Sequence, residues 1–168
     1  MVGRSIPKRA FGLQEDELLK ERNTYSFFSA VQHHFGFVAE YGFSNAFDSE
    51  SRVLYQSKRA YIEVTHERND GEVAISFGRA TEKEKFSFTL FLRLKNYALE
   101  QALGERLAET PSEVEECLSK LSQALKTEGH DILHGNDAIF EQMKDVRWWH
   151  FRPEALKTGD PNEVLPDN

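Results

Sequence analysis

The chain has 168 residues, of which 28 are acidic and 21 are basic, and its formal net charge is -7. This length is typical of one domain with a core of its own. The acidic balance argues against non-specific binding to nucleic acid or anionic membranes, because both require a basic surface. No stretch approaches the roughly 18 unbroken apolar residues of a membrane span, so neither nucleic acid nor membrane is expected as a partner.

Cysteine content and the start of the chain both indicate the compartment. The single cysteine, Cys117, cannot form an internal disulfide and fits a reducing environment. The basic start of the chain is not followed by the apolar segment of a secretory signal. We therefore expect a cytoplasmic protein with a flexible arm over residues 1–12, one domain over residues 13–152 and a mobile tail over residues 153–168.

Two helices are predicted before the first strand. Acidic residues in the first turn favour a short helix over residues 13–22. Apolar residues that recur with a helical period predict a second helix over residues 25–41. Gly42 is suited to end this second helix, although Gly36 is unfavourable inside it.

Alternating apolar and polar residues predict four consecutive strands, at residues 43–47, 53–57, 60–67 and 72–79. The dipeptide at 58–59 can close a tight turn between the second and third strands. A two-residue loop there sets Tyr55 against Ile62 and Val53 against Val64, which extends one apolar face across both strands.

The hairpin formed by the last two of these strands is the best-specified segment, because Asn69-Asp70-Gly71 supplies residues that tolerate a positive φ. A four-residue loop (68–71) pairs Ile62 with Phe77. A two-residue loop (70–71) shifts the partners but keeps both apolar rows on one face. A three-residue loop would separate the rows, which is strongly disfavoured when one face is buried. The choice between two and four residues stays open.

The second half of the chain changes to a helical pattern. Residues 86–94 begin with strand alternation and then become continuously apolar. One interpretation is a last strand over residues 86–89 followed by a helix over residues 90–95, but periodicity alone leaves the choice open. Leu99, Leu103 and Leu107 then repeat at every fourth position and predict a helix that includes all three.

A long helix is predicted next, because Thr110, Pro111 and Glu113 form a strong start signal with a capping box. Its apolar stripe consists of Val114, Cys117, Leu118, Leu121, Ala124 and Leu125. A connector over residues 130–135 separates it from a further helix that Asn136 caps. The inward-facing residues of that last helix are Ile139, Phe140 and Met143.

The order of these elements defines the fold class. Strands come first and helices afterwards, without strand–helix alternation, which is typical of α+β proteins. We predict an antiparallel meander sheet of about four to five strands, with an N-terminal helix and C-terminal helices packed on one face.

Histidines are the most suggestive metal-ligating residues. His130 and His134 are four residues apart, a spacing that places two ligands on one helix face. A composite site of His34, His66 and His134 is a second option. Two surface histidines in a loop and a hydrogen-bonded, partly buried His66 are the simpler interpretations, so no metal site is expected.

The sequence gives little support for a nucleophilic residue or for a cofactor site. Cys117 lies on an apolar helix stripe and is interpreted as a core side chain. The sequence has no Gly-x-Ser-x-Gly elbow, no glycine-rich phosphate loop and no dinucleotide fingerprint. We expect no cofactor and no catalytic residues, and an enzyme is the less favoured interpretation.

Two groups of residues are candidates for partner contact. Glu63, Glu67 and Glu72 line the polar face of the hairpin and would form an acidic docking surface, or simply a solvated sheet face. Arg147, Trp148 and Trp149 combine the residue types that dominate interface hot spots. The alternative for the tryptophans is that at least one covers the core.

The order of features also resembles a group of uncharacterised bacterial cytosolic proteins, some of them linked to toxin–immunity systems. The resemblance covers about residues 28–143 and rests on structural segments rather than catalytic motifs. These segments are Phe37-Val-Ala-Glu-Tyr-Gly-Phe43, Val53-Leu-Tyr55, Ile62-Glu-Val64, Glu72-Val-Ala-Ile-Ser76, Phe86-Ser-Phe88 and Ile132-Leu-His-Gly-Asn136. The resemblance implies an α+β fold and a protein-binding role.

The leading hypothesis is therefore a non-catalytic protein-binding module, resembling an immunity protein, whose acidic surface docks on a basic partner. The alternative is a metal- or small-ligand-binding protein, or an enzyme, that uses a pocket containing histidine. The oligomeric state stays open.

Overall fold

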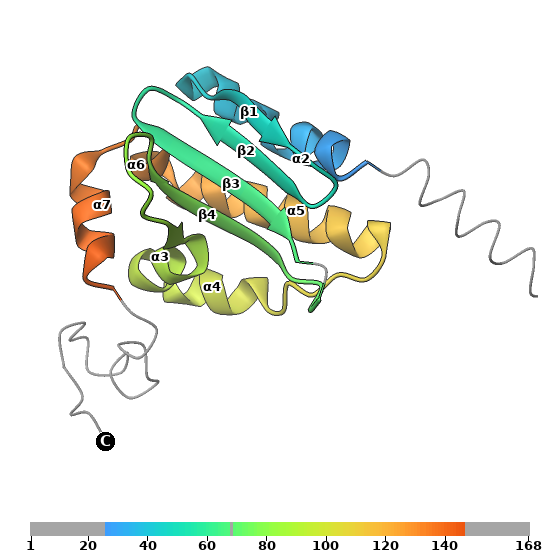
Figure 1. Ribbon diagram of the computed structural model, residues 1–168. Coiled ribbons are helices and arrows are strands. Elements are labelled where there is room, and N and C mark those ends of the chain that lie inside the picture. Colours follow the sequence, from blue (N-terminus) through green and yellow to red (C-terminus); the bar gives the residue numbers. More distant parts are fainter. Residues whose placement is uncertain (1–25, 68, 147–168) are drawn as a thin grey trace, which may run out of the picture.

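The computed structural model describes residues 26–67 and 69–146 (Figure 1). The elements in chain order are α2 (Phe27–Phe35), the 3-10 helix η1 (Gly36–Tyr41), β1 (Ser44–Asp48), β2 (Arg52–Gln56), β3 (Ala60–His66), β4 (Val73–Arg79), β5 (Phe86–Ser87), α3 (Phe88–Lys95), α4 (Tyr97–Leu103), α5 (Pro111–Glu128), α6 (His130–Leu133) and α7 (Asp137–Lys144). The predicted arm at 1–12, the helix at 13–22 and the tail at 153–168 lie outside the described residues.

The five strands form one antiparallel sheet in the order β1-β2-β3-β4-β5. Each strand pairs with its neighbour in sequence, so the sheet is a meander. Figure 1 shows α5 running behind the sheet, with α2 beside it, and α2 and α5 contact each other and the strands. The predicted α+β class, with an N-terminal helix and C-terminal helices around an antiparallel meander, is confirmed.

The inner face of the sheet is apolar and buried because every second residue of β2, β3 and β4 points to the helices. The buried strand residues on this face are Val53, Tyr55, Ile62, Val64, Val73, Ile75 and Phe77. Phenylalanine rings fill the space between the layers: the Phe77 ring centroid lies 5.8 Å from that of Phe91 and 6.2 Å from that of Phe140. The predicted apolar stripe of α5 is buried on the same core.

The two turns at the ends of β3 fix the register of the sheet. Tyr55 pairs with Ile62, as predicted for a two-residue turn at 58–59. Ile62 also pairs with Phe77 across the hairpin, which selects the four-residue loop over the two-residue alternative. The Glu67 amide donates to the Glu72 carbonyl oxygen at 2.8 Å and closes this loop.

Several predicted helix and strand boundaries shift in the structure. The helix expected over 25–41 is regular only to Phe35, and the chain tightens into η1 from Gly36, the residue that weakened the prediction. Gly42 ends it with φ 85°, as expected for a glycine C-cap. β5 stops at Ser87 because the Ser87 hydroxyl accepts from the Leu90 amide and starts α3 two residues early.

The prediction that Leu107 continues the helix of Leu99 and Leu103 is wrong. α4 ends at Leu103 because Gly104 takes a positive φ of 63°. Leu107 instead forms a β-bridge with Glu72 at the end of the hairpin, and its side chain is 53% exposed.

The last helices follow the start signals in the sequence. α5 begins with the predicted capping box of Thr110 and Glu113. The connector expected at 130–135 contains the one-turn helix α6. Asn136 precedes α7 as predicted, but its side chain donates to the Asp131 carboxylate at 2.7 Å rather than capping the helix.

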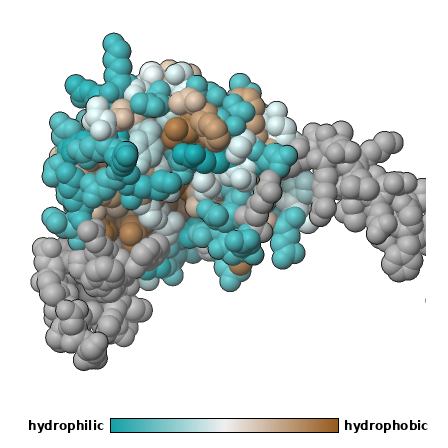
Figure 2. Space-filling view, in the orientation of Figure 1, coloured by the Kyte–Doolittle hydropathy of each residue, from teal (hydrophilic) through white to brown (hydrophobic). Residues whose placement is uncertain are grey.

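The outer face of the sheet, turned to the viewer in Figure 2, mixes polar residues with a hydrophobic patch over β1 and β2. The Tyr61 ring lies over Gly78 on the neighbouring strand, and its hydroxyl donates to the Glu84 carbonyl oxygen at 2.6 Å. Burial, together with the carboxylates of Glu63 and Glu84, raises the pKa of Tyr61 to about 12, so this hydroxyl remains a donor at neutral pH. The 80–85 connection is thereby tied to the sheet.

Replacing Gly78 by alanine tests this contact. A Cβ there would collide with the Glu84 carbonyl oxygen and would lie 2.7 Å from the Tyr61 ring. We therefore expect Gly78→Ala to lower the free energy of unfolding by about 1–3 kcal/mol. Gly36→Ala is the matched control, because a Cβ at Gly36 meets nothing within 4 Å. The control should leave stability unchanged or raise it by up to about 1 kcal/mol. Urea unfolding measures both variants, and equal effects would contradict the packing described.

Candidate functional site at the acidic end of the sheet

Glu63 is buried, so the expectation that its carboxylate lies on a solvated or docking face of the sheet is wrong. It points to the outer face of the sheet but is only 3% exposed. The Nε of Arg52 donates to Glu63 Oε2 at 2.6 Å, and the Nζ of Lys85 donates to Glu63 Oε1 at 2.7 Å. Two cations therefore cover and neutralise the carboxylate that was expected to belong to an acidic docking surface.

The balance of forces on Glu63 keeps it ionised. Burial acts to raise the pKa of its carboxyl group, but the hydrogen bonds from Lys85 and Arg52, with their charges, outweigh burial and lower the pKa. The Arg52 guanidinium also lies 5.1 Å from the centre of the Phe47 ring on β1, so this cluster ties three neighbouring strands together on their outer side.

Glu67 and Glu72 lie at the loop end of the hairpin, directly after β3 and directly before β4. Glu67 is exposed. Glu72 is partly buried, and its Oε1 lies 3.7 Å from Arg106 Nη2. The segment containing Arg106 and Leu107 pairs with this end of the hairpin through the Val73 amide, which donates to the Arg106 carbonyl oxygen at 2.8 Å.

This pairing creates a surface that we call the acidic end: the exposed side chain of Leu107 with the exposed carboxylates of Glu67, Asp70, Glu105 and Glu109. The hairpin supplies two of the acids and the 104–110 connection supplies the other two, on the right in Figure 1. None of the four carboxylates forms a salt bridge with another described residue. The surface therefore combines an exposed apolar side chain with carboxylates that have no ion-pair partner among the described residues.

Sequence reasoning missed Leu107, Glu105 and Glu109 as surface residues because leucine spacing suggested a continuous helix. Gly104 is the signal that could have revealed the break, since a glycine with positive φ commonly ends a helix. Arg147, Trp148 and Trp149, the other candidate contact residues, lie outside the described residues.

The three histidines of the composite hypothesis are engaged with partners on different elements. His34 Nε2 lies 2.5 Å from the Glu115 carboxylate on α5. His66 Nε2 is 2.9 Å from the Ala108 carbonyl oxygen, and this confirms the interpretation of His66 as a partly buried, hydrogen-bonded residue. His134 lies at the other end of β3, with its ring 5.2 Å from that of Tyr41.

The described residues contain neither a group of metal ligands nor a membrane-spanning helix. Within residues 26–67 and 69–146, no three His, Cys, Asp or Glu side chains are grouped so that they could hold a metal ion. In the same residues, none of the helices has the length and hydrophobicity to cross a membrane. Cys117 is buried on the core side of α5, as predicted.

Comparison with known proteins adds no relative to this description. No family model matches the chain, and neither curated proteins nor solved structures give a match. The structure thus defines an α+β domain with an antiparallel meander sheet and a group of exposed carboxylates at one end of it. The resemblance to immunity-linked proteins stays a prediction.

Replacing Glu63 by glutamine tests the buried ion cluster. Because the folded pKa of Glu63 is lowered, its ionised form stabilises the protein above the ordinary carboxyl pKa, and this contribution is lost as pH falls through the folded pKa. We expect Glu63→Gln to lower the free energy of unfolding by about 1–3 kcal/mol at neutral pH. The difference in this free energy between the variant and the native chain should shrink on acidification. Urea unfolding across pH measures it, with the exposed Glu84→Gln as control. A constant difference at all pH values would contradict the assignment.

Thiol reactivity tests the position of Cys117. Burial is the main reason why the pKa of the Cys117 thiol is raised. Only 9% of the surface of Cys117 is exposed. We expect alkylation of the native protein to be much slower than alkylation of the urea-unfolded chain, because the reactive thiolate is scarce and hidden. Equal rates in the two states would show that this face of α5 opens readily.

Proposed function

We propose that this protein is a non-catalytic, cytoplasmic protein-binding module whose acidic end docks onto a basic partner protein. The proposed role resembles that of an immunity protein that covers the active surface of a toxin acting on nucleic acid. The observation that carries the proposal is Leu107, a large apolar side chain held 53% exposed among four carboxylates.

The arrangement around Leu107 has the anatomy of a protein interface. Interfaces commonly place apolar anchors at the centre and polar groups at the rim. The backbone on either side of Leu107 is fixed, since the Ala108 amide donates to the Gly71 carbonyl oxygen at 2.9 Å and Val73 bonds to Arg106. A rigid anchor loses little conformational entropy when it is buried by a partner.

Charge indicates the kind of partner. The acids of the hairpin and of the 104–110 connection share one end of a chain whose net charge is -7. A protein that acts on nucleic acid carries a basic surface, and opposite fields accelerate encounter between the two. Acidic residues around an apolar centre can therefore steer such a partner and then exclude water from the contact.

Substitutions at the acidic end test the proposal against the products of neighbouring genes. We expect at least one of these products to bind the native chain with an affinity that falls as salt rises. Leu107→Ser should weaken this binding by about tenfold or more, because it removes the apolar anchor. Glu67→Lys should slow association several-fold at low salt and have less effect at high salt. Surface plasmon resonance measures both rates and affinity.

Glu40→Lys is the matched control for charge, because Glu40 is exposed on η1 and forms no salt bridge with a described residue. It should leave the association rate close to that of the native chain. The proposal fails if no neighbouring product shows salt-sensitive binding, or if Glu67→Lys and Glu40→Lys behave alike.

A further inference from the structure

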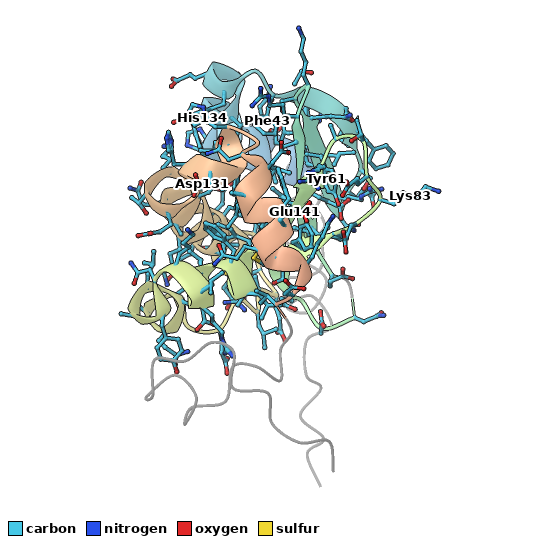
Figure 3. All side chains as sticks on the ribbon, turned by 90° about the vertical axis from the view of Figure 1, so that its left-hand side faces the viewer. Phe43, Tyr61, Lys83, Asp131, His134 and Glu141 are labelled. Carbon is cyan, nitrogen blue, oxygen red and sulfur yellow. The ribbon has the colours of Figure 1, made fainter. Side chains whose placement is uncertain are left out.

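A pocket of about 280 Å³ lies at the end of β3 opposite the acidic end. It is lined by Tyr41, Gly42, Ser57, Lys58, Arg59, Leu133 and His134. Three segments far apart in sequence build it: the end of η1, the turn between β2 and β3, and α6. Figure 3 looks at the molecule from this end and shows His134 near Phe43, the residue after Gly42.

The β2–β3 turn is a rigid wall of this pocket. The Ser57 hydroxyl accepts from the Ala60 amide at 3.0 Å and from the Arg59 amide at 3.3 Å. The Ala80 amide donates to the Arg59 carbonyl oxygen at 2.9 Å. The stem of Arg59 packs on the backbone of Gly135, where an added Cβ would lie 2.5 Å from the Arg59 Cβ. Only glycine at 135 permits this approach.

The charge of the pocket is opposite to that of the whole chain. Lys58 and Arg59 are both exposed, and neither forms a salt bridge with another described residue. His134 adds a ring that contacts Tyr41 at 5.2 Å and His130 at 4.2 Å between ring centroids. In a chain of net charge -7, two adjacent uncompensated cations at the mouth of a pocket favour an anionic ligand.

We propose that this pocket binds a small organic phosphate monoester. Lys58 and Arg59 supply positive charge for the phosphate group, and His134 and Tyr41 supply polar groups that can hydrogen-bond to its oxygens. Ser57 shapes the wall instead, because its hydroxyl donates to the Ala60 carbonyl oxygen at 3.2 Å. Leu133 and the Tyr41 ring offer apolar surface for the organic part. This binding activity is separate from the docking of a protein at the acidic end.

A phosphate monoester fits the lining better than two other classes of ligand. It carries about two negative charges and three strong acceptor oxygens, which can use more of these donors than a single carboxylate can. A metal ion on His130 and His134 would lie beside the cations that line the same pocket, and the resulting repulsion disfavours it. The pocket volume of about 280 Å³ is just below the usual range of ligand pockets, so a compact molecule is indicated.

Titration of the full chain with phenyl phosphate, benzoate and phenol tests the inference. Isothermal calorimetry should show saturable binding of phenyl phosphate at least about tenfold tighter than that of benzoate, and no binding of phenol. Lys58→Met and Arg59→Met should each weaken the binding of phenyl phosphate by about tenfold. Arg59→Met keeps the stem that packs on Gly135, and Lys58→Met serves independently if that packing is disturbed.

Lys83→Met is the matched control, since Lys83 is exposed on the β4–β5 connection and points away from His134 in Figure 3. It should bind phenyl phosphate like the native chain. The inference is overturned if phenyl phosphate binds no tighter than benzoate, or if the Lys58 and Lys83 variants lose affinity equally. Stoichiometric zinc binding that is abolished by His130→Ala, with no phosphate binding, would overturn it in favour of a metal site.

Discussion

The structure depends on covering the apolar inner row of a single antiparallel sheet. Val64, Ile75 and Phe77 form the middle of that row and are at most 3% exposed. A sheet with one apolar face is stable only when another layer removes that face from water. α2 and α5 lie behind the sheet (Figure 1), and Phe91 of α3 and Phe140 of α7 also pack on Phe77. Because the helices occupy one face and the strands run antiparallel, the turns gather at the two ends of the sheet. The exposed polar residues of both proposed sites lie at those ends.

The two ends differ in charge, and this difference organises both proposals. The hairpin end presents Leu107 among exposed carboxylates, whereas the opposite end presents Lys58 and Arg59 around a pocket. Between the ends, the Glu63 carboxylate on the outer face is fully paired, since Arg52 and Lys85 both bond to it. One chain thus carries two separate surfaces of opposite sign. A partner and a ligand of opposite charge could be bound together without competing for the same residues.

The elements that were predicted correctly are those with a strong local signal. Alternation in β3 and β4, the turn at 58–59 and the capping box of Thr110 depend on residues close in sequence, so they could be read directly. The candidate site could not be read in this way. Leu107 leaves its helical pattern because Gly104 ends α4 and the hairpin offers backbone partners. Glu63 is buried because Arg52 and Lys85 reach it from other segments, and periodicity carries no information on such distant partners.

The meander has a consequence for how the chain folds. Every strand pairs with the strand next to it in sequence, and the two central connections are closed by residues 58–59 and 68–71. Closing short loops costs little chain entropy, and proteins rich in sequence-local contacts fold faster than those with distant pairings. The contact between α2 and α5, by contrast, joins segments separated by the whole sheet. We therefore expect the central hairpins to form early in folding and the contact between α5 and α2 to form after them.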